Sequence, residues 1–200
     1  MPQMFHKCRD LYLYIMRRNT NHAAVKPNSL NLFSRYCVSS LVFASFRRKP
    51  TKQVLIIYIT NFYYSFIAST LKLLYSDRRD IRLLNVHGGN TTDTVLAGKL
   101  DDAIAIGFHY KKQMLFWTDV SLEAIMRKSL KGNSKQEIVV STGLVRPEGL
   151  AVDWVTSKIY WIDSHSKLVE VANMDGSQRS VLFWSNLDQP RAIVVDPLHG

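Results

Sequence analysis

The C-terminal two thirds of the chain repeats at an interval of about forty-four residues, and this interval restricts the possible folds more than any other feature. Trp117 and Trp161 are 44 residues apart. The same interval recurs twice in two further sets, which are Ile81, Ile125 and Val169, and Gly88, Gly132 and Gly176. A fixed period of roughly 20 to 50 residues is typical of proteins built from similar structural units. The sequence therefore predicts several copies of one small unit.

Each repeat contains four short runs rich in branched and aromatic residues, which favour β-strands. In the most regular copy these runs are GLAVDW (149–154), KIYWID (158–163), LVEVANM (168–174) and SVLFW (180–184). Asp175-Gly176, between the last two runs, predicts a hairpin turn because glycine accepts a positive φ. Four strands in forty-odd residues is the size of one β-propeller blade.

We therefore expect an all-β fold that forms part of a six-bladed β-propeller. Two complete four-stranded blades are predicted at 102–142 and 148–185, and parts of two more at 72–97 and 191–197. A ring of six such blades needs about 260 residues, whereas residues 71–200 supply 130. The expectation is a fragment or truncated product that folds as an open arc, whose exposed blade faces and strand edges favour self-association.

An aromatic pair followed by an aspartate recurs at the second strand of each complete repeat. The two sets are Phe116, Trp117 and Asp119, and Tyr160, Trp161 and Asp163. Aromatic side chains suit the packing between blades because they bury a large apolar area. A carboxylate just after a strand can accept hydrogen bonds from backbone N–H groups of the adjoining loop. We favour this structural role over the alternative, a ring of catalytic or metal-binding acids.

These motifs resemble a known family. The runs FWTD (116–119), YWID (160–163), NMDGS (173–177) and LDQPRAIVVDP (187–197) are similar to the YWTD β-propeller of the low-density lipoprotein receptor family. Three longer runs resemble the first propeller of its Wnt co-receptor members, including insect Arrow: LLYSDRRDIRLLNV (73–86), DVSLEAIMR (119–127) and SVLFWSNLDQPRAI (180–193). The resemblance covers about 71–200 and implies an extracellular ligand-binding module that is not an enzyme.

The resemblance also implies which residues contact partners. The family holds secreted antagonists such as sclerostin and Dickkopf on the face formed by the blade tops, and it engages Wnt proteins and Frizzled-type receptors. Arg78, Glu123, Glu148 and Arg191 match positions of that face, with Glu148 where the family usually has Asp. His165 stands where an acid is usual, which is a departure from the family pattern. The alternative is that all five are ordinary solvated loop residues, which contribute little singly.

Two further functions fit the same architecture. One is another lipoprotein-receptor-type propeller that binds cargo or matrix, and the other is a calcium-dependent propeller hydrolase. The hydrolase requires converging acids on the axis or a nucleophile with its base. His87, His109 and His165 fall in separate repeats and form no such constellation. We expect no catalytic residue, no cofactor and no metal.

The first seventy residues differ in charge from the rest. Residues 1–70 hold ten basic residues and one acid, whereas 71–200 hold sixteen basic and fifteen acidic residues. The eighteen residues 54–71 carry no charge and follow a basic stretch, as in a signal peptide or signal anchor; a buried strand pair is the alternative. We expect a basic, poorly structured extension over 1–53, a hydrophobic targeting segment over 54–70 and a partial propeller over 71–200.

A nucleic-acid partner is disfavoured, because the basic extension has no compact basic helix or recognition motif. Asn90-Thr91-Thr92 is the single N-x-S/T sequon of the chain, and it would be glycosylated only after export. Together with the resemblance, these features predict the secretory pathway or the extracellular side of the plasma membrane. Membrane attachment is expected only through the hydrophobic segment or through a C-terminal span such as the family has.

Overall fold

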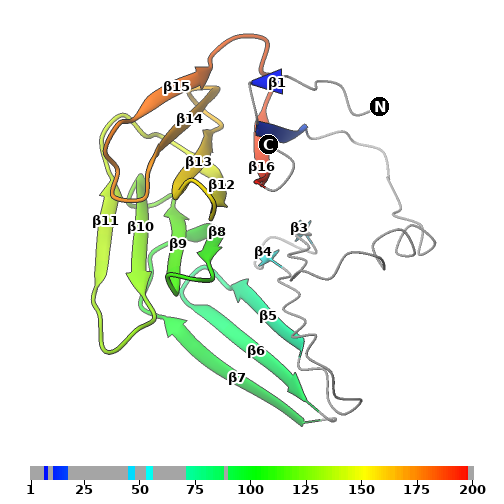
Figure 1. Cartoon of the computed structure of the whole chain (residues 1–200), viewed down its shortest axis with the longest axis vertical. Helices are drawn as coiled ribbons and strands as arrows, with labels where there is room; N and C mark the ends of the chain where they lie inside the picture. Colours follow the sequence, from blue (N-terminus) through cyan, green and yellow to red (C-terminus); the bar gives the residue numbers. More distant parts are fainter. Residues whose placement is uncertain are drawn as a thin grey trace, which may run out of the picture.

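The computed structural model describes residues 71–87 and 90–197, together with four short strands within the first seventy residues. Every regular element of these residues is a β-strand, which confirms the all-β prediction. Among the described residues, no helix is long and apolar enough to cross a membrane. Figure 1 shows the sheets following one another along an arc.

Two four-stranded antiparallel sheets form the complete blades. The first consists of β8 (Ala103–His109), β9 (Met114–Asp119), β10 (Ala124–Ser129) and β11 (Gln136–Val140). The second consists of β12 (Pro147–Asp153), β13 (Lys158–Asp163), β14 (Leu168–Asn173) and β15 (Ser180–Phe183). The next inner strand, β16 (Pro190–Asp196), packs beside β12. The predicted pair of blades and the start of a third are confirmed.

The aromatic residues of the repeat pack between the sheets. Phe116 of the first blade and Trp161 of the second belong to one buried cluster, because they project from their strands toward each other. Trp117, the neighbour of Phe116, points to the opposite face and packs against β5 and β6. Tyr160 likewise faces away from Trp161 and packs against β16. Successive strand residues point to opposite faces, so an aromatic pair fills the interfaces on both sides of its blade.

The strands before the first complete blade form a five-stranded sheet. Its order is β3 (Ser45–Arg47), β4 (Gln53–Leu55), β5 (Leu71–Ser76), β6 (Ile81–His87) and β7 (Asn90–Ala97). The strands β5 to β7 are those predicted for 72–97. The pairing of β4 with β5 extends the sheet into a segment that the repeat pattern did not include.

A second pairing also involves the first seventy residues. The strands β1 (Lys7–Cys8) and β2 (Leu11–Arg17) form a sheet with β16, in which β2 is antiparallel to β16. The alternating sequence of β2 suits a strand, and the edge of β16 supplies its hydrogen-bond partners. Apart from the two residues in β4, the segment predicted for targeting lies outside the described residues. The division at residues 53 and 70 stays a prediction.

The hairpin at Asp175-Gly176 has the geometry that its sequence predicts. Gly176 has a φ of +86°, and its N–H donates to the carbonyl of Asn173 at 2.9 Å. A Cβ added to Gly176 would lie 2.3 Å from the backbone oxygen of Val139, in the outer strand of the preceding blade. The glycine is therefore required by its φ and by the close approach of two blades.

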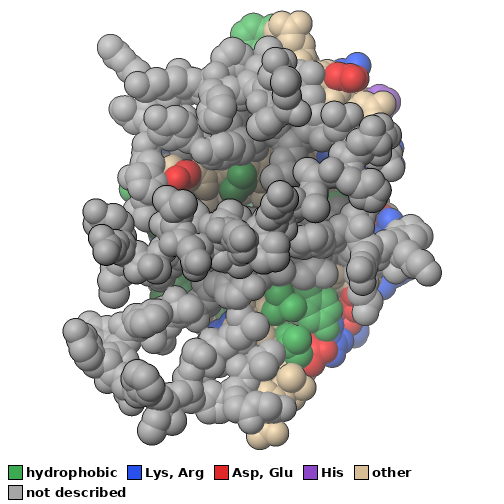
Figure 2. Space-filling model, turned by 90° about the vertical axis from the view of Figure 1, so that its right-hand side faces the viewer, with side chains coloured by type: hydrophobic (Ala, Val, Ile, Leu, Met, Phe, Trp, Pro, Cys, Tyr) green, Lys and Arg blue, Asp and Glu red, His purple; other side chains and the backbone are tan. Residues whose placement is uncertain are grey.

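Charges of both signs are interspersed over the described part of the chain. Arg82 forms an ion pair with Asp93 at 3.1 Å, and Arg127 forms one with Glu137 at 2.8 Å. In Figure 2, hydrophobic side chains adjoin acidic and basic ones in the lower part of the face shown. This mixture differs from the single-sign patch that nucleic-acid binding surfaces present.

Candidate binding face

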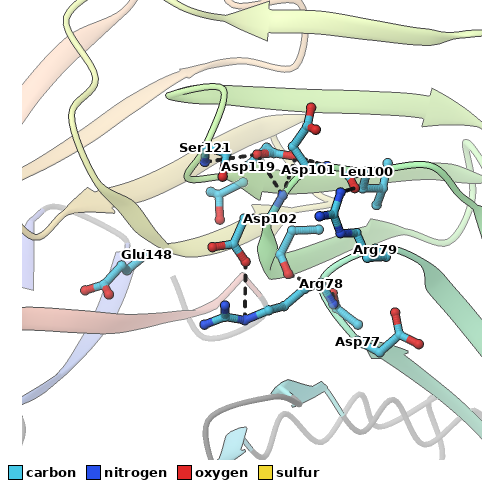
Figure 3. A network of polar contacts seen from close by, with 12 residues as sticks. Asp77, Arg78, Arg79, Leu100, Asp101, Asp102, Asp119, Ser121 and Glu148 are labelled. Carbon is cyan, nitrogen blue, oxygen red and sulfur yellow. Dashed lines mark hydrogen bonds and ion pairs between the residues drawn. The ribbon is translucent and has the colours of Figure 1, made fainter.

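The candidate face is formed by the loops at one end of the blades, and Asp119 ties two of these loops together. Its carboxylate accepts hydrogen bonds from the backbone N–H groups of Ser121 and Leu122, which follow β9, each at 3.1 Å. It also accepts from the N–H groups of Asp101 and Asp102, which precede β8, at 3.1 to 3.2 Å. Figure 3 shows this network. The loop after β9 is thereby fixed against the entry to the inner strand.

Asp163 repeats the arrangement in the next blade. It accepts from the N–H groups of Val145 at 2.6 Å and Arg146 at 2.9 Å, before β12, and from His165 at 3.1 Å and Ser166 at 2.9 Å, after β13. Burial acts to raise the pKa of Asp163, yet the four N–H groups outweigh it and lower the pKa below its usual value. The carboxylate thus stays ionised and fully engaged, which supports a structural role.

Glu148 is a further buried charge of the face, and it forms an ion pair with Arg191. The register of β12 with β13 shifts at Glu148, and the register of β16 with β2 shifts at Arg191, so both residues lie in β-bulges. A bulge redirects the side chain of the extra residue. Since β12 and β16 lie side by side, Glu148 Oε1 comes within 3.1 Å of Arg191 Nη1.

A second arginine approaches the same carboxylate. Arg146 Nε lies 3.6 Å from Glu148 Oε1, and the Glu148 side chain is only 6% exposed, whereas that of Arg146 is 57% exposed. Among the described residues, Glu148 Oε2 and Arg191 Nε have no hydrogen-bond partner. Both atoms are buried, so a bound polar group would reach this cluster through the guanidinium groups of Arg146 and Arg191, whose side chains are 57% and 30% exposed.

Arg78 lies in the loop between β5 and β6, next to the first complete blade. Its Nε lies 3.3 Å from Asp102 Oδ1 in an ion pair without hydrogen-bond geometry, and its side chain is 47% exposed. The backbone oxygen of Arg78 accepts from the N–H of Ala103 at 2.9 Å, which anchors the loop to β8. In Figure 3, the Arg78 side chain extends toward Asp102, and Glu148 lies to the side of this pair.

Glu123 and His165 occupy the loops after β9 and β13. Both are exposed, and Glu123 has a φ of +49°. Within the described residues, no hydrogen bond or ion pair joins either side chain to Arg78, Glu148 or Arg191. Of the five predicted positions, the structure brings Glu148 and Arg191 into contact and leaves the other three in separate loops. Their roles in binding stay predictions.

Two residues of the face were missed by the sequence analysis, namely Asp102 and Arg146. Each lies just before an inner strand, and they are 44 residues apart, so an alignment of the repeats on the inner strands would have placed them together. The described residues contain no group of three or more His, Cys, Asp or Glu side chains that could hold a metal ion.

Asn90, the predicted glycosylation site, lies away from this face. It is exposed and begins β7 at the hairpin that joins β6 to β7. The loops of the candidate face lie at the other end of these strands, where β7 leads toward β8.

Comparison with known proteins is consistent with this architecture. Residues 113–154 and 157–197 match the low-density lipoprotein receptor repeat class B. Over 135 residues the chain is 50% identical to low-density lipoprotein receptor-related protein 5 of Mus musculus and 48% identical to that of Homo sapiens. Each match covers 66% of this chain, and the chain spans 8% of the length of each relative.

A solved structure has a similar fold. A chain in the crystal structure of a nidogen–laminin complex is 34% identical and superposes with a TM-score of 0.60, over 64% of this chain and 50% of that chain. The repeats, the blades and the identity to the receptor-related proteins agree. The chain therefore carries part of a YWTD β-propeller that is similar to those of the low-density lipoprotein receptor-related proteins.

Proposed function

We propose that this chain contributes to the extracellular ligand-binding propeller of a Wnt co-receptor-like receptor. The proposed binding face carries Arg78, Glu123, Glu148, His165 and Arg191. The observation that carries the proposal is the buried Glu148–Arg191 pair, built by matching bulges in adjacent inner strands. Apolar residues of similar volume often stabilise a fold as well as a buried ion pair does. A buried charge pair at this position is therefore better explained by recognition than by stability.

The chemistry of the face fits a ligand that presents both donors and acceptors. The partly exposed guanidinium groups of Arg146 and Arg191 can donate hydrogen bonds, and the exposed carboxylate of Glu123 can accept them. An asparagine side chain supplies both functions through its NH₂ group and its carbonyl oxygen. This supports secreted antagonists with an Asn-containing motif, of the sclerostin or Dickkopf kind, and Wnt proteins as partners, with a Frizzled-type receptor as the co-receptor's companion.

The same proposal assigns a binding role rather than catalysis, on the extracellular side of the plasma membrane or in the secretory pathway. The supporting observation is the identity to receptor-related proteins. In addition, the carboxylates of Asp119 and Asp163 are occupied by backbone N–H groups, which leaves them poorly suited to acid–base or calcium chemistry. A propeller hydrolase is therefore the weaker alternative.

A second candidate function is the binding of matrix or cargo proteins. The 34% identity to a chain of a nidogen–laminin complex favours it, because that structure was solved as a complex of two proteins. The two candidates differ in which partner the face selects. Binding of a laminin fragment that does not depend on Glu148 would favour the matrix function.

The test is a titration of the full chain with an Asn-containing antagonist peptide, using Glu148→Gln and Arg78→Ala. Glu148→Gln keeps the shape of the side chain but removes the charge that pairs with Arg191. The pair lies within this chain, so its loss acts on binding by releasing the Arg191 guanidinium from its fixed position. A hydrogen bond that involves a charged group contributes about 1.5 to 3 kcal/mol, so we expect roughly 10-fold weaker binding or more. Arg78→Ala changes an exposed side chain and should weaken binding without altering the fold.

Glu137→Gln is the matched control, because it removes an ion-paired carboxylate from the outer strand β11, away from the proposed face. Its affinity for the peptide should equal that of the unmodified chain. Circular dichroism would establish that all variants retain their strands. Unchanged peptide affinity in both Glu148→Gln and Arg78→Ala would show that this face is not the binding surface.

A further inference from the structure

Asn90 begins the outermost strand of the sheet that precedes the first complete blade. We propose that Asn90 carries an N-linked glycan and that this glycan covers the free edge of β7. The inference rests on the proposed extracellular function, because N-linked glycans are added only to exported chains. It goes beyond that function by assigning a modification site and a role for it.

The environment of Asn90 leaves room for a large polar substituent. Asn90 pairs with His87 across the hairpin and is exposed. The first six residues of β7 are all exposed, and burial begins only at its last two residues. The hydroxyl of Thr92, which completes the sequon, is also exposed and contacts Asn85 Nδ2 at 3.4 Å. No packed side chain of the described residues obstructs the sequon.

The strand that carries Asn90 has an edge that needs protection. β7 is the last strand of its sheet and, at 8 residues, the longest strand among the described residues. Lys128 of the next blade donates to the backbone oxygen of Leu96 near the end of β7, so the exposed edge is that of its first six residues. A long exposed edge offers unpaired N–H and C=O groups to another chain and promotes association. A glycan at the start of this strand is bulky and hydrophilic, so it would hinder a second chain from pairing there.

The same placement keeps the glycan away from the proposed binding face. β7 runs from Asn90 to Ala97, and the residues that follow lead to Asp102 on that face. At about 3.3 Å per residue, the strand separates the two sites by roughly 23 Å. Figure 1 shows the β6–β7 hairpin at the far end of its sheet from the point where β7 leads to β8. Modification and ligand binding are therefore compatible.

The test is to express the full chain in a secretory cell and to measure its mass before and after treatment with N-glycosidase. Thr92→Ala destroys the sequon, whereas Thr92→Ser preserves it and retains a hydroxyl near Asn85. We expect one glycan on the unmodified chain and on Thr92→Ser, and none on Thr92→Ala. The Asn90 site is refuted if the exported chain carries no glycan there.

Lys135→Thr provides an internal control in the corresponding hairpin of the next blade. It turns Asn133-Ser134-Lys135, in which Asn133 and Lys135 are exposed, into a sequon. Modification of Asn133 but not Asn90 would leave the extracellular function standing and overturn this inference. Modification of neither site would show that the chain does not enter the secretory lumen, and both proposals would fall.

The covering role has its own readout. Light scattering should detect association of the enzymatically deglycosylated chain at several-fold lower protein concentration than that of the glycosylated chain. Equal association before and after removal of the glycan would overturn the covering role, whatever the occupancy of Asn90. Peptide binding to the proposed face should be the same with and without the glycan, and a loss of affinity on glycosylation would contradict the placement argued here.

Discussion

Replacement of Glu170 by methionine should destabilise the second blade strongly. Glu170 is 3% exposed and lies opposite Trp161, whose indole N–H donates to its Oε2 at 3.0 Å. Arg179 donates to both carboxylate oxygens, each at 2.8 Å, and its guanidinium lies 5.4 Å from the centre of the Trp161 ring. Arg179 also donates to the backbone oxygens of Thr142 and Gly143, so the network links this blade to the preceding loop.

The chain supplies its own reference for this change. Met126 occupies the corresponding position of the first complete blade, opposite Trp117, whose Nε1 has no hydrogen-bond partner among the described residues. Glu170→Met therefore places in the second blade the residue that the first blade has at the same position. The difference is that the second blade also contains Arg179, which the substitution leaves without its carboxylate.

The expected loss is about 2 to 4 kcal/mol in the free energy of unfolding. An orphaned indole N–H costs about 1 to 3 kcal/mol, and loss of one partner of a fully buried ion pair costs about 3 to 5 kcal/mol. The second contribution is smaller here, because the Arg179 side chain is 25% exposed and keeps two backbone acceptors. The double variant Glu170→Met, Arg179→Met should recover part of the loss, since it removes the unpaired cation.

Urea denaturation of the full chain, followed by tryptophan fluorescence, measures this effect as a shift in midpoint. Glu137→Gln is the control, because it breaks an ion pair whose carboxylate is 56% exposed. Exposed pairs contribute about 0 to 1 kcal/mol. A Glu170→Met midpoint that matches the Glu137→Gln midpoint would refute the reasoning that the buried network holds the blades together.

Three further substitutions test single contacts. Burial, aided by a neighbouring lysine, lowers the pKa of His109, so the histidine resists protonation in the fold and stability should fall as the pH drops below about 6.5. His109→Asp introduces the residue found at the corresponding position of the next repeat. It should make the melting temperature less dependent on pH between 7.5 and 5.5, and an equal fall in melting temperature for the variant and the unmodified chain would contradict this. Asp163→Asn should lower the free energy of unfolding by about 2 to 4 kcal/mol. It should also speed amide hydrogen exchange in the two loops that Asp163 joins, and unchanged exchange rates would count against that role. Gly176→Ala should destabilise more than Gly132→Ala, because only the former would place a Cβ near a backbone oxygen; equal urea midpoints would exclude the close approach.

The blades could be predicted from the sequence because each is a local unit with its own strands and turns. The 44-residue period places Trp117 and Trp161 at the same position of consecutive sheets, and the alternation of strand faces then assigns each aromatic side chain to an interface. The pairing of β2 with β16 had no such signal. These strands are far apart in the chain, and β2 belongs to no repeat.

The candidate site was predicted less completely, for a physical reason. Glu148 and Arg191 were selected singly, but their contact depends on two bulges and on the packing of β12 beside β16. Bulges leave little trace in the sequence, because they insert one residue without changing the strand pattern on either side. The burial of His109 was likewise not predicted from the sequence, because it follows only from the packed structure.

The bulge position also shows how the chemistry of the face can change from repeat to repeat while the fold is kept. Ile104, Glu148 and Arg191 occupy this position in three successive inner strands, β8, β12 and β16, so its chemistry changes from apolar to acidic to basic. The tryptophans and aspartates of the second strand keep their types, because they fill the blade interfaces and tie the loops. A bulged residue lies outside the hydrogen-bond ladder of its own sheet, so it is free to vary while the blade remains intact. The fold thus separates the residues that build the propeller from those that we propose to contact its ligands.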